Sequence, residues 1–141
     1  MDTHISGLLR FCSGAIASLT RSFDVQAAQL PFIEVYGARG TLSGPDPNTF
    51  GGPVRACPAD SAEFSDRPLE FPFTENSRGL GLSDMADAIR TARAPRAGGG
   101  IALHVLKTMH GILESVARGV TVQIDSRPER PLPMPPCSRM A

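Results

Sequence analysis

The chain has 141 residues, 41% of them hydrophobic and 20% charged, and its fourteen Lys and Arg balance fourteen Asp and Glu. This length suits one domain with a single core, and zero formal net charge excludes the long-range field that gathers nucleic acid or an anionic membrane. The three cysteines, Cys12, Cys57 and Cys137, are too widely spaced for a zinc site or a disulfide framework, so we expect a reducing environment.

The sequence shows no targeting or membrane signal. No apolar run approaches the ~20 residues that span a bilayer, and residues 1–4 lack the basic start and apolar run of a signal peptide. We therefore expect a cytoplasmic protein with neither a membrane nor nucleic acid among its partners.

Alternation of apolar and polar residues predicts strands in the first part of the chain. Residues 5–11 and 18–25 alternate in this way around a turn at Ser13-Gly14, which is typical of an antiparallel hairpin. Residues 32–36 and 41–43 predict a third and a fourth strand on either side of a glycine turn. Residues 44–78 are rich in proline and loop-like, with short strands expected near 54–55 and 69–71, where proline confines them to sheet edges.

Helical spacing of apolar residues begins after this loop. A first helix is expected around Leu82–Ile89, capped by Ser83 or a residue just before it. Pro95 lies beyond its end, and the glycine run 98–100 is expected to separate it from the next helix.

A second helix is expected over about residues 101–117, with Gly119 placed to end it. Residues 120–125 then alternate again and predict a last strand. The tail, residues 127–141, contains five prolines at positions 128, 131, 133, 135 and 136 and should be extended.

Together these elements predict an α+β fold, a mostly antiparallel open sheet with two helices packed on one face. We assign residues 1–126 to this domain and residues 127–141 to a Pro-rich extended tail. The other face of the sheet carries Ser, Thr, Gln and Asp, and it can face water or a copy of itself.

Two loops carry polar side chains that a polyol could bind, namely Asp46 with Asn48, and Asn76 with Arg78. Turn chemistry explains most of the same residues without a ligand, because Asp46 or Asn48 can bond to nearby backbone and Asn76 can open a helix. We favour the turn for both loops. A fixed Arg78 could still contact substrate hydroxyls or a neighbouring subunit.

Other chemical signals favour ordinary structural roles. The glycine pairs at 37–40 and 79–81 do not form a dinucleotide-binding element between a strand and a helix. Lys107 points away from the apolar stripe of its helix, and His104 and His110 are six residues apart rather than the four of helical metal pairs. The residues by themselves therefore give no catalytic, cofactor-binding or metal-binding assignment.

Several segments stand in a particular order and spacing: Ser22-Phe23-Asp24-Val25, residues 33–42, 45–54, 76–82, 84–86, 88–89 and 102–106, and the strand after Gly119. In this arrangement the chain, from about His4 to Arg130, resembles the C-terminal domain of the Gfo/Idh/MocA oxidoreductases. Members of that family have an N-terminal Rossmann domain that binds NAD or NADP, and a C-terminal domain whose open sheet lines the substrate pocket and mediates oligomer contacts.

The resemblance implies the C-terminal part of a dehydrogenase that acts on a sugar, a cyclitol or a related polyol, contributing pocket wall and subunit interface. The Rossmann domain, the family's Glu-Lys-Pro lysine and its Asp-x-x-x-His helix have no counterpart in the sequence. The resemblance therefore implies no catalytic residue here and no NAD or NADP bound by this chain alone. It suggests a truncated product, a fragment, or a domain that forms a homo-oligomer or pairs with a Rossmann-containing partner.

Two other functions stay open, a non-catalytic assembly or dimerisation module and a small-ligand sensor built on the same sheet. If the chain is truncated, surfaces that pack on the missing half should be exposed. We expect such exposure around Leu8, Ile16 and the apolar stripes of the two helices.

Overall fold

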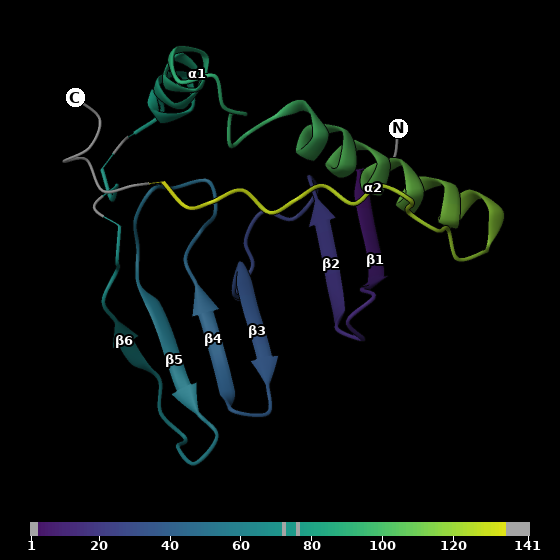
Figure 1. Cartoon of the computed structure of the whole chain (residues 1–141). Helices are drawn as coiled ribbons and strands as arrows, with labels where there is room; N and C mark the ends of the chain where they lie inside the picture. Colours follow the sequence, from purple (N-terminus) through teal and green to yellow (C-terminus); the bar gives the residue numbers. More distant parts are fainter. Residues whose placement is uncertain (1–2, 72, 76, 135–141) are drawn as a thin grey trace. The chain divides into compact units, whose positions relative to one another are not determined.

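The computed structural model describes residues 3–71, 73–75 and 77–134, which form six strands and two helices. All strand pairs are antiparallel, and they make one sheet of two strands and one of four (Figure 1). The predicted α+β class is confirmed, but the strands are divided between two sheets instead of forming one open sheet.

The chain divides into two compact units. The first contains the residues up to Leu30 and Val105–Ser126, and the second contains Pro31–His104 and the residues after Ser126. The two-stranded sheet therefore belongs to the first unit, and the four-stranded sheet belongs to the second.

The two-stranded sheet is the predicted N-terminal hairpin. Strand β1 (His4–Arg10) pairs with β2 (Ile16–Ser22) over their whole length, from His4 opposite Ser22 to Arg10 opposite Ile16. Gly14 adopts a φ of +89°, which favours glycine, and its N–H donates to the carbonyl of Phe11 at 2.9 Å. The turn chemistry expected from the sequence therefore closes this hairpin.

The four-stranded sheet follows chain order, with β3 (Ile33–Gly37), β4 (Gly40–Gly44), β5 (Val54–Pro58) and β6 (Ser65–Arg67). Gly40 is required at the β3–β4 turn, because its φ is +137° and an added Cβ would lie 2.2 Å from the carbonyl oxygen of Cys57. The turn thus lets β4 approach β5 closely at this point.

Two strand predictions were wrong. The short strand expected at residues 69–71 is not formed, and the fourth strand of the sheet is β6, a few residues earlier. Residues 120–125 alternate as expected but belong to neither sheet. Alternation predicts which way side chains point, whereas a strand also needs a neighbour for its backbone hydrogen bonds.

Both predicted helices form, with different beginnings. Helix α1 (Leu80–Arg90) is preceded by Gly79, which makes no side-chain cap, so the expected cap at or just before Ser83 was wrong. Helix α2 (Gly99–Arg118) includes two glycines of the run that was expected to separate the helices. Gly119, with a φ of +65°, follows its last residue as predicted.

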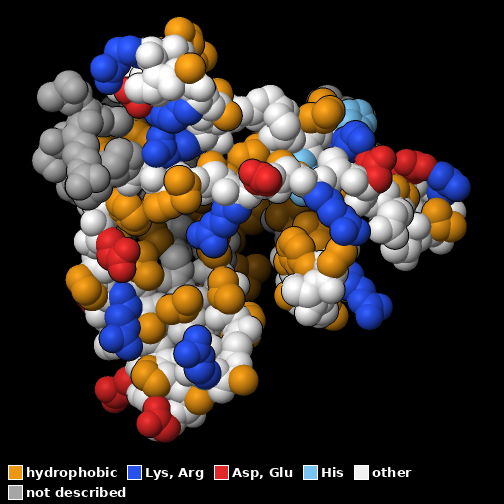
Figure 2. Space-filling view, viewed as in Figure 1, with side chains coloured by type: hydrophobic (Ala, Val, Ile, Leu, Met, Phe, Trp, Pro, Cys, Tyr) orange, Lys and Arg blue, Asp and Glu red, His pale blue; other side chains and the backbone are white. Residues whose placement is uncertain are grey.

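Apolar burial is sparse across the described residues, where Ala88, 2% exposed, is the one buried hydrophobic side chain. The expected exposure is confirmed for Leu8 at 76% and Ile16 at 70%. It is also confirmed for members of both helical stripes, including Leu82, Met85, Ile89, Val105, Met109 and Val116. Figure 2 shows hydrophobic side chains reaching the surface in many places.

Candidate functional site

The loop before β5 places two of the sequence-predicted polar residues within a short turn. The carboxylate of Asp46 accepts the backbone N–H of Asn48 at 2.9 Å, and the carbonyl of Asp46 accepts the N–H of Thr49 at 3.1 Å. The Thr49 hydroxyl donates to the same carbonyl at 2.8 Å. Asp46 therefore serves as the cap of a turn, the interpretation favoured from the sequence.

Two glycines bring this loop against the segment that leads to α1. An added Cβ on Gly51 would lie 2.8 Å from the carbonyl oxygen of Thr74. Gly52 has a φ of +118°, and a Cβ there would lie 2.6 Å from Pro45. Any side chain at either position would therefore push the loop away from Thr74 or strain its backbone.

The approach of these segments leaves an open depression of about 520 Å³ in the second unit, which we call the loop depression. Its lining comes from both segments: Asn48, Thr49, Phe50, Gly51, Gly52, Thr74, Glu75 and Arg78. The structure thus brings together Asn48 and Arg78, two of the predicted site residues. Asp46 is not among the lining residues, and Asn76 lies outside the described residues.

The loop depression offers the chemistry of a polar ligand site. Amide, hydroxyl, carboxylate and guanidinium groups supply both donors and acceptors, as hydroxyl-rich ligands need. Phe50 adds an apolar surface to this lining. Among the described residues, the lining contains no histidine, cysteine or lysine.

A second, smaller groove of about 220 Å³ lies in the first unit between α2 and residues 122–125. Gly111 makes the close approach possible, since a Cβ there would lie 2.6 Å from the Cδ1 of Ile124. Lys107 donates to the carboxylate of Asp125 at 2.9 Å beside this groove, and this hydrogen bond lowers the pKa of Asp125. Lys107 is thus an ion-paired residue of the helix surface.

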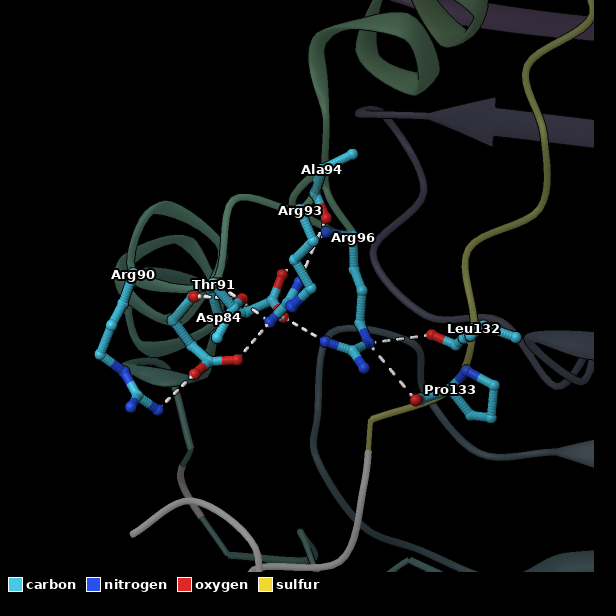
Figure 3. Close-up of polar contacts among 9 residues, drawn as sticks. Asp84, Arg90, Thr91, Arg93, Ala94, Arg96, Leu132 and Pro133 are labelled. Atoms are coloured by element: carbon cyan, nitrogen blue, oxygen red, sulfur yellow. Dashed lines mark hydrogen bonds and ion pairs between the residues drawn. The ribbon is translucent and has the colours of Figure 1, made fainter.

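The most tightly bonded polar cluster is one that the sequence analysis missed. Asp84 of α1 is only 4% exposed, and its carboxylate accepts hydrogen bonds from the loop that follows the helix. Arg93 donates to it at 2.8 Å, the backbone N–H of Arg96 donates at 2.7 Å, and the Arg96 guanidinium bonds to it as well (Figure 3). We call these three residues, together with Asp87, the Asp84 cluster.

Hydrogen bonds to the charged form lower the pKa of Asp84 from 3.8 to about 2, first the one from the backbone N–H of Arg96 and then the one from Arg93. Arg93 also bonds to Asp87 at 2.8 Å, which lowers the pKa of Asp87. Asp84 therefore stays ionised at neutral pH and holds no proton to transfer. The cluster orders the loop rather than performing acid–base chemistry.

A sequence signal for this cluster does exist. Asp84 and Asp87 are three apart on one helical face, and arginines follow at positions 90, 93 and 96. Such spacing indicates ion pairing along a helix, but Arg93 and Arg96 lie beyond the end of α1. Their contacts depend on the chain folding back after Thr91, which the spacing does not reveal.

Within the described ranges, no three His, Cys, Asp or Glu side chains gather in a way that would hold a metal ion. Neither described helix combines the length and apolar character needed to cross a bilayer. Comparison with protein-family models, curated proteins and solved structures found no match to this chain.

Proposed function

We propose that this chain is a non-catalytic module of an NAD(P)-dependent oxidoreductase acting on a sugar, a cyclitol or a related polyol. It contributes an interface to a Rossmann-containing partner or to a second copy, together with part of the substrate pocket. The interface part of the proposal rests on the large set of apolar side chains left exposed on the sheets and helices of both units. The oxidoreductase part rests on the resemblance of the sequence to the family.

The hairpin supports the interface role most clearly. Leu8 and Ile16 lie on the same face of β1–β2, since Leu8 pairs with Ser18 and Ile16 pairs with Arg10. Both side chains are exposed, and the other face of β1 is the half-buried one. Water-exposed apolar side chains that lie next to one another are typical of surfaces that a partner covers.

The loop depression supports the pocket-wall role. It is open, and its donors and acceptors suit hydroxyl groups. A hydride transfer would take its chemistry from the nicotinamide, which in the family that the sequence resembles binds to a Rossmann domain. We therefore assign to Asn48, Thr49 and Arg78 the binding of substrate hydroxyls, with no catalytic step on this chain.

The whole chain can be tested by titration with NADH and with NADPH, followed by assay of myo-inositol oxidation. We expect no nucleotide binding and no turnover, together with self-association in sedimentation velocity or co-sedimentation with a Rossmann-containing enzyme of the family. Tight NADH binding by the chain alone would contradict the proposal. A strict monomer at high concentration that joins no such enzyme would contradict its interface part.

The alternative is an assembly module without any substrate role, which the exposed apolar faces support independently of the loop depression. The two functions differ in what Arg78→Ala does within a reconstituted complex. A pocket-wall role predicts a higher KM for the polyol with association unchanged. A pure assembly role predicts no change in KM.

A further inference from the structure

Arg96 bonds to a segment of the chain that is far away in sequence. Its Nε–H lies 2.9 Å from the carbonyl oxygen of Leu132 and 3.3 Å from that of Pro133, within the second unit (Figure 3). The same guanidinium bonds to Asp84 through Nη1. One side chain thus joins α1 to the Pro-rich tail.

The tail segment has the chemistry that such a donor recognises. Residues 127–134 form no helix or strand, and prolines at 128, 131 and 133 remove backbone N–H groups while leaving the carbonyls in place. The residue before a proline is held extended, so the carbonyls of such a segment stay free of internal hydrogen bonds. An arginine side chain, which only donates, matches this row of acceptors.

Arg96 is held in place independently of the tail. Asp84 accepts both its backbone N–H and its guanidinium, and Arg93 donates to the same Oδ1 as the Arg96 guanidinium. With the tail in contact, 23% of the Arg96 side chain is exposed. A donor already fixed by its neighbours loses little conformational entropy when the tail binds.

We propose that Arg96, positioned by Asp84, is a docking site for an extended proline-rich segment, which residues 132–133 of this chain occupy as a strap. The groups recognised are main-chain carbonyls, so the site selects extended backbone and is tolerant of side chains. Leu132 illustrates this, because its carbonyl is bound while the residue is 79% exposed.

The test is backbone ¹⁵N relaxation of the full chain, read at the amide of residue 132. We expect an order parameter near that of rigid backbone, about 0.85, in the original chain and below about 0.6 in Arg96→Ala. Arg96→Lys should also lower the order parameter of residue 132. A single ammonium group cannot replace a planar guanidinium that bonds to the Asp84 carboxylate and to the tail carbonyls at the same time. Leu132→Ala should leave it rigid.

Arg90→Ala is the matched control, because Arg90 pairs with Asp87 and bonds to none of the described tail residues. It should leave residue 132 rigid. A flexible amide at 132 in the original chain would overturn the proposal whatever the variants do. If the amide of residue 132 stays rigid in Arg96→Ala, or becomes flexible in Leu132→Ala, then side-chain packing and not Arg96 holds the strap.

Discussion

The loop after α1 and the β1–β2 hairpin leave their side chains in opposite states. In the loop, Arg93 and Arg96 donate hydrogen bonds to the carboxylate of Asp84, which is only 4% exposed. In the hairpin, the two strands pair along their whole length while Leu8 and Ile16 remain in water. The polar groups of the loop thus find their hydrogen-bond partners within the chain. The exposed apolar side chains of the hairpin can be covered only by another surface.

The contrast also indicates where stability comes from in this chain. With Ala88 as the one buried hydrophobic side chain among the described residues, hydrophobic burial contributes less than it usually does in folding. Hydrogen bonds to charged groups, worth roughly 1.5–3 kcal/mol each, then contribute an unusually large share of the stability of the loop after α1. We expect marginal stability and a tendency to associate, and a sharp, reversible melt of a monomer would contradict this expectation.

The largest effect should come from Asp84→Ala. It removes the acceptor shared by Arg93 and Arg96, and we expect a loss of about 2–3 kcal/mol in the free energy of unfolding, measured by urea titration. Asp87→Ala is the control, since its carboxylate is 39% exposed and is bound by side chains alone. Equal losses from the two substitutions would show that the Asp84 cluster has no special role.

The same carboxylate predicts a pH dependence. The pKa of Asp84 is lowered from 3.8 to about 2, so its contribution to stability is complete above pH 4 and is lost as the pH falls towards 2. The urea midpoint should therefore decline between pH 4 and pH 2, and less steeply in Asp84→Asn. An identical decline in this variant would assign the acid sensitivity to other carboxylates.

Hairpin substitutions should behave in the opposite way. Leu8→Ser combined with Ile16→Ser should change the free energy of unfolding of the monomer by less than about 0.5 kcal/mol, because both side chains are already exposed. Association in sedimentation velocity should weaken clearly. Leu30→Ser is an equally exposed control outside both sheets. If Leu30→Ser weakens association to the same extent, the hairpin is not the interface.

The smallest effect is expected for Arg118→Ala at the end of α2. Its pairing with Glu114, four residues earlier, is exposed on both sides, and such helical pairs contribute about 0.3–0.5 kcal/mol. The unfolding free energy should fall by this amount at low salt and by less at 1 M salt, where charges are screened. A salt-independent loss would point to packing of the arginine stem instead.

Several elements followed from short-range pattern alone. Alternation and a glycine turn predicted the β1–β2 hairpin, and helical spacing predicted α1 and α2, because the periods of side-chain direction are fixed by the backbone. The Asp46 turn was also expected, since an aspartate bonds to backbone two residues away. In each case the partners are close in sequence.

The failures involve pairings of segments that neither alternation nor helical spacing predicts. Residues 120–125 alternate like a strand but have no ladder in the described structure, and β6 lacks apolar alternation yet pairs with β5. Asn48 and Arg78 were singled out separately, and only the close approach at Gly51 places them around one depression. Periodicity does not specify which segments meet.

The sequence by itself determined the α+β class, the hairpin, the two helices and the surfaces that would be left apolar, because these depend on local backbone geometry and on side-chain type. Only the tertiary structure decided the division into two sheets, the Asp84 cluster and the bond from Arg96 to the tail. These depend on where a loop folds back, and so on hydrogen-bond partners up to 37 residues apart.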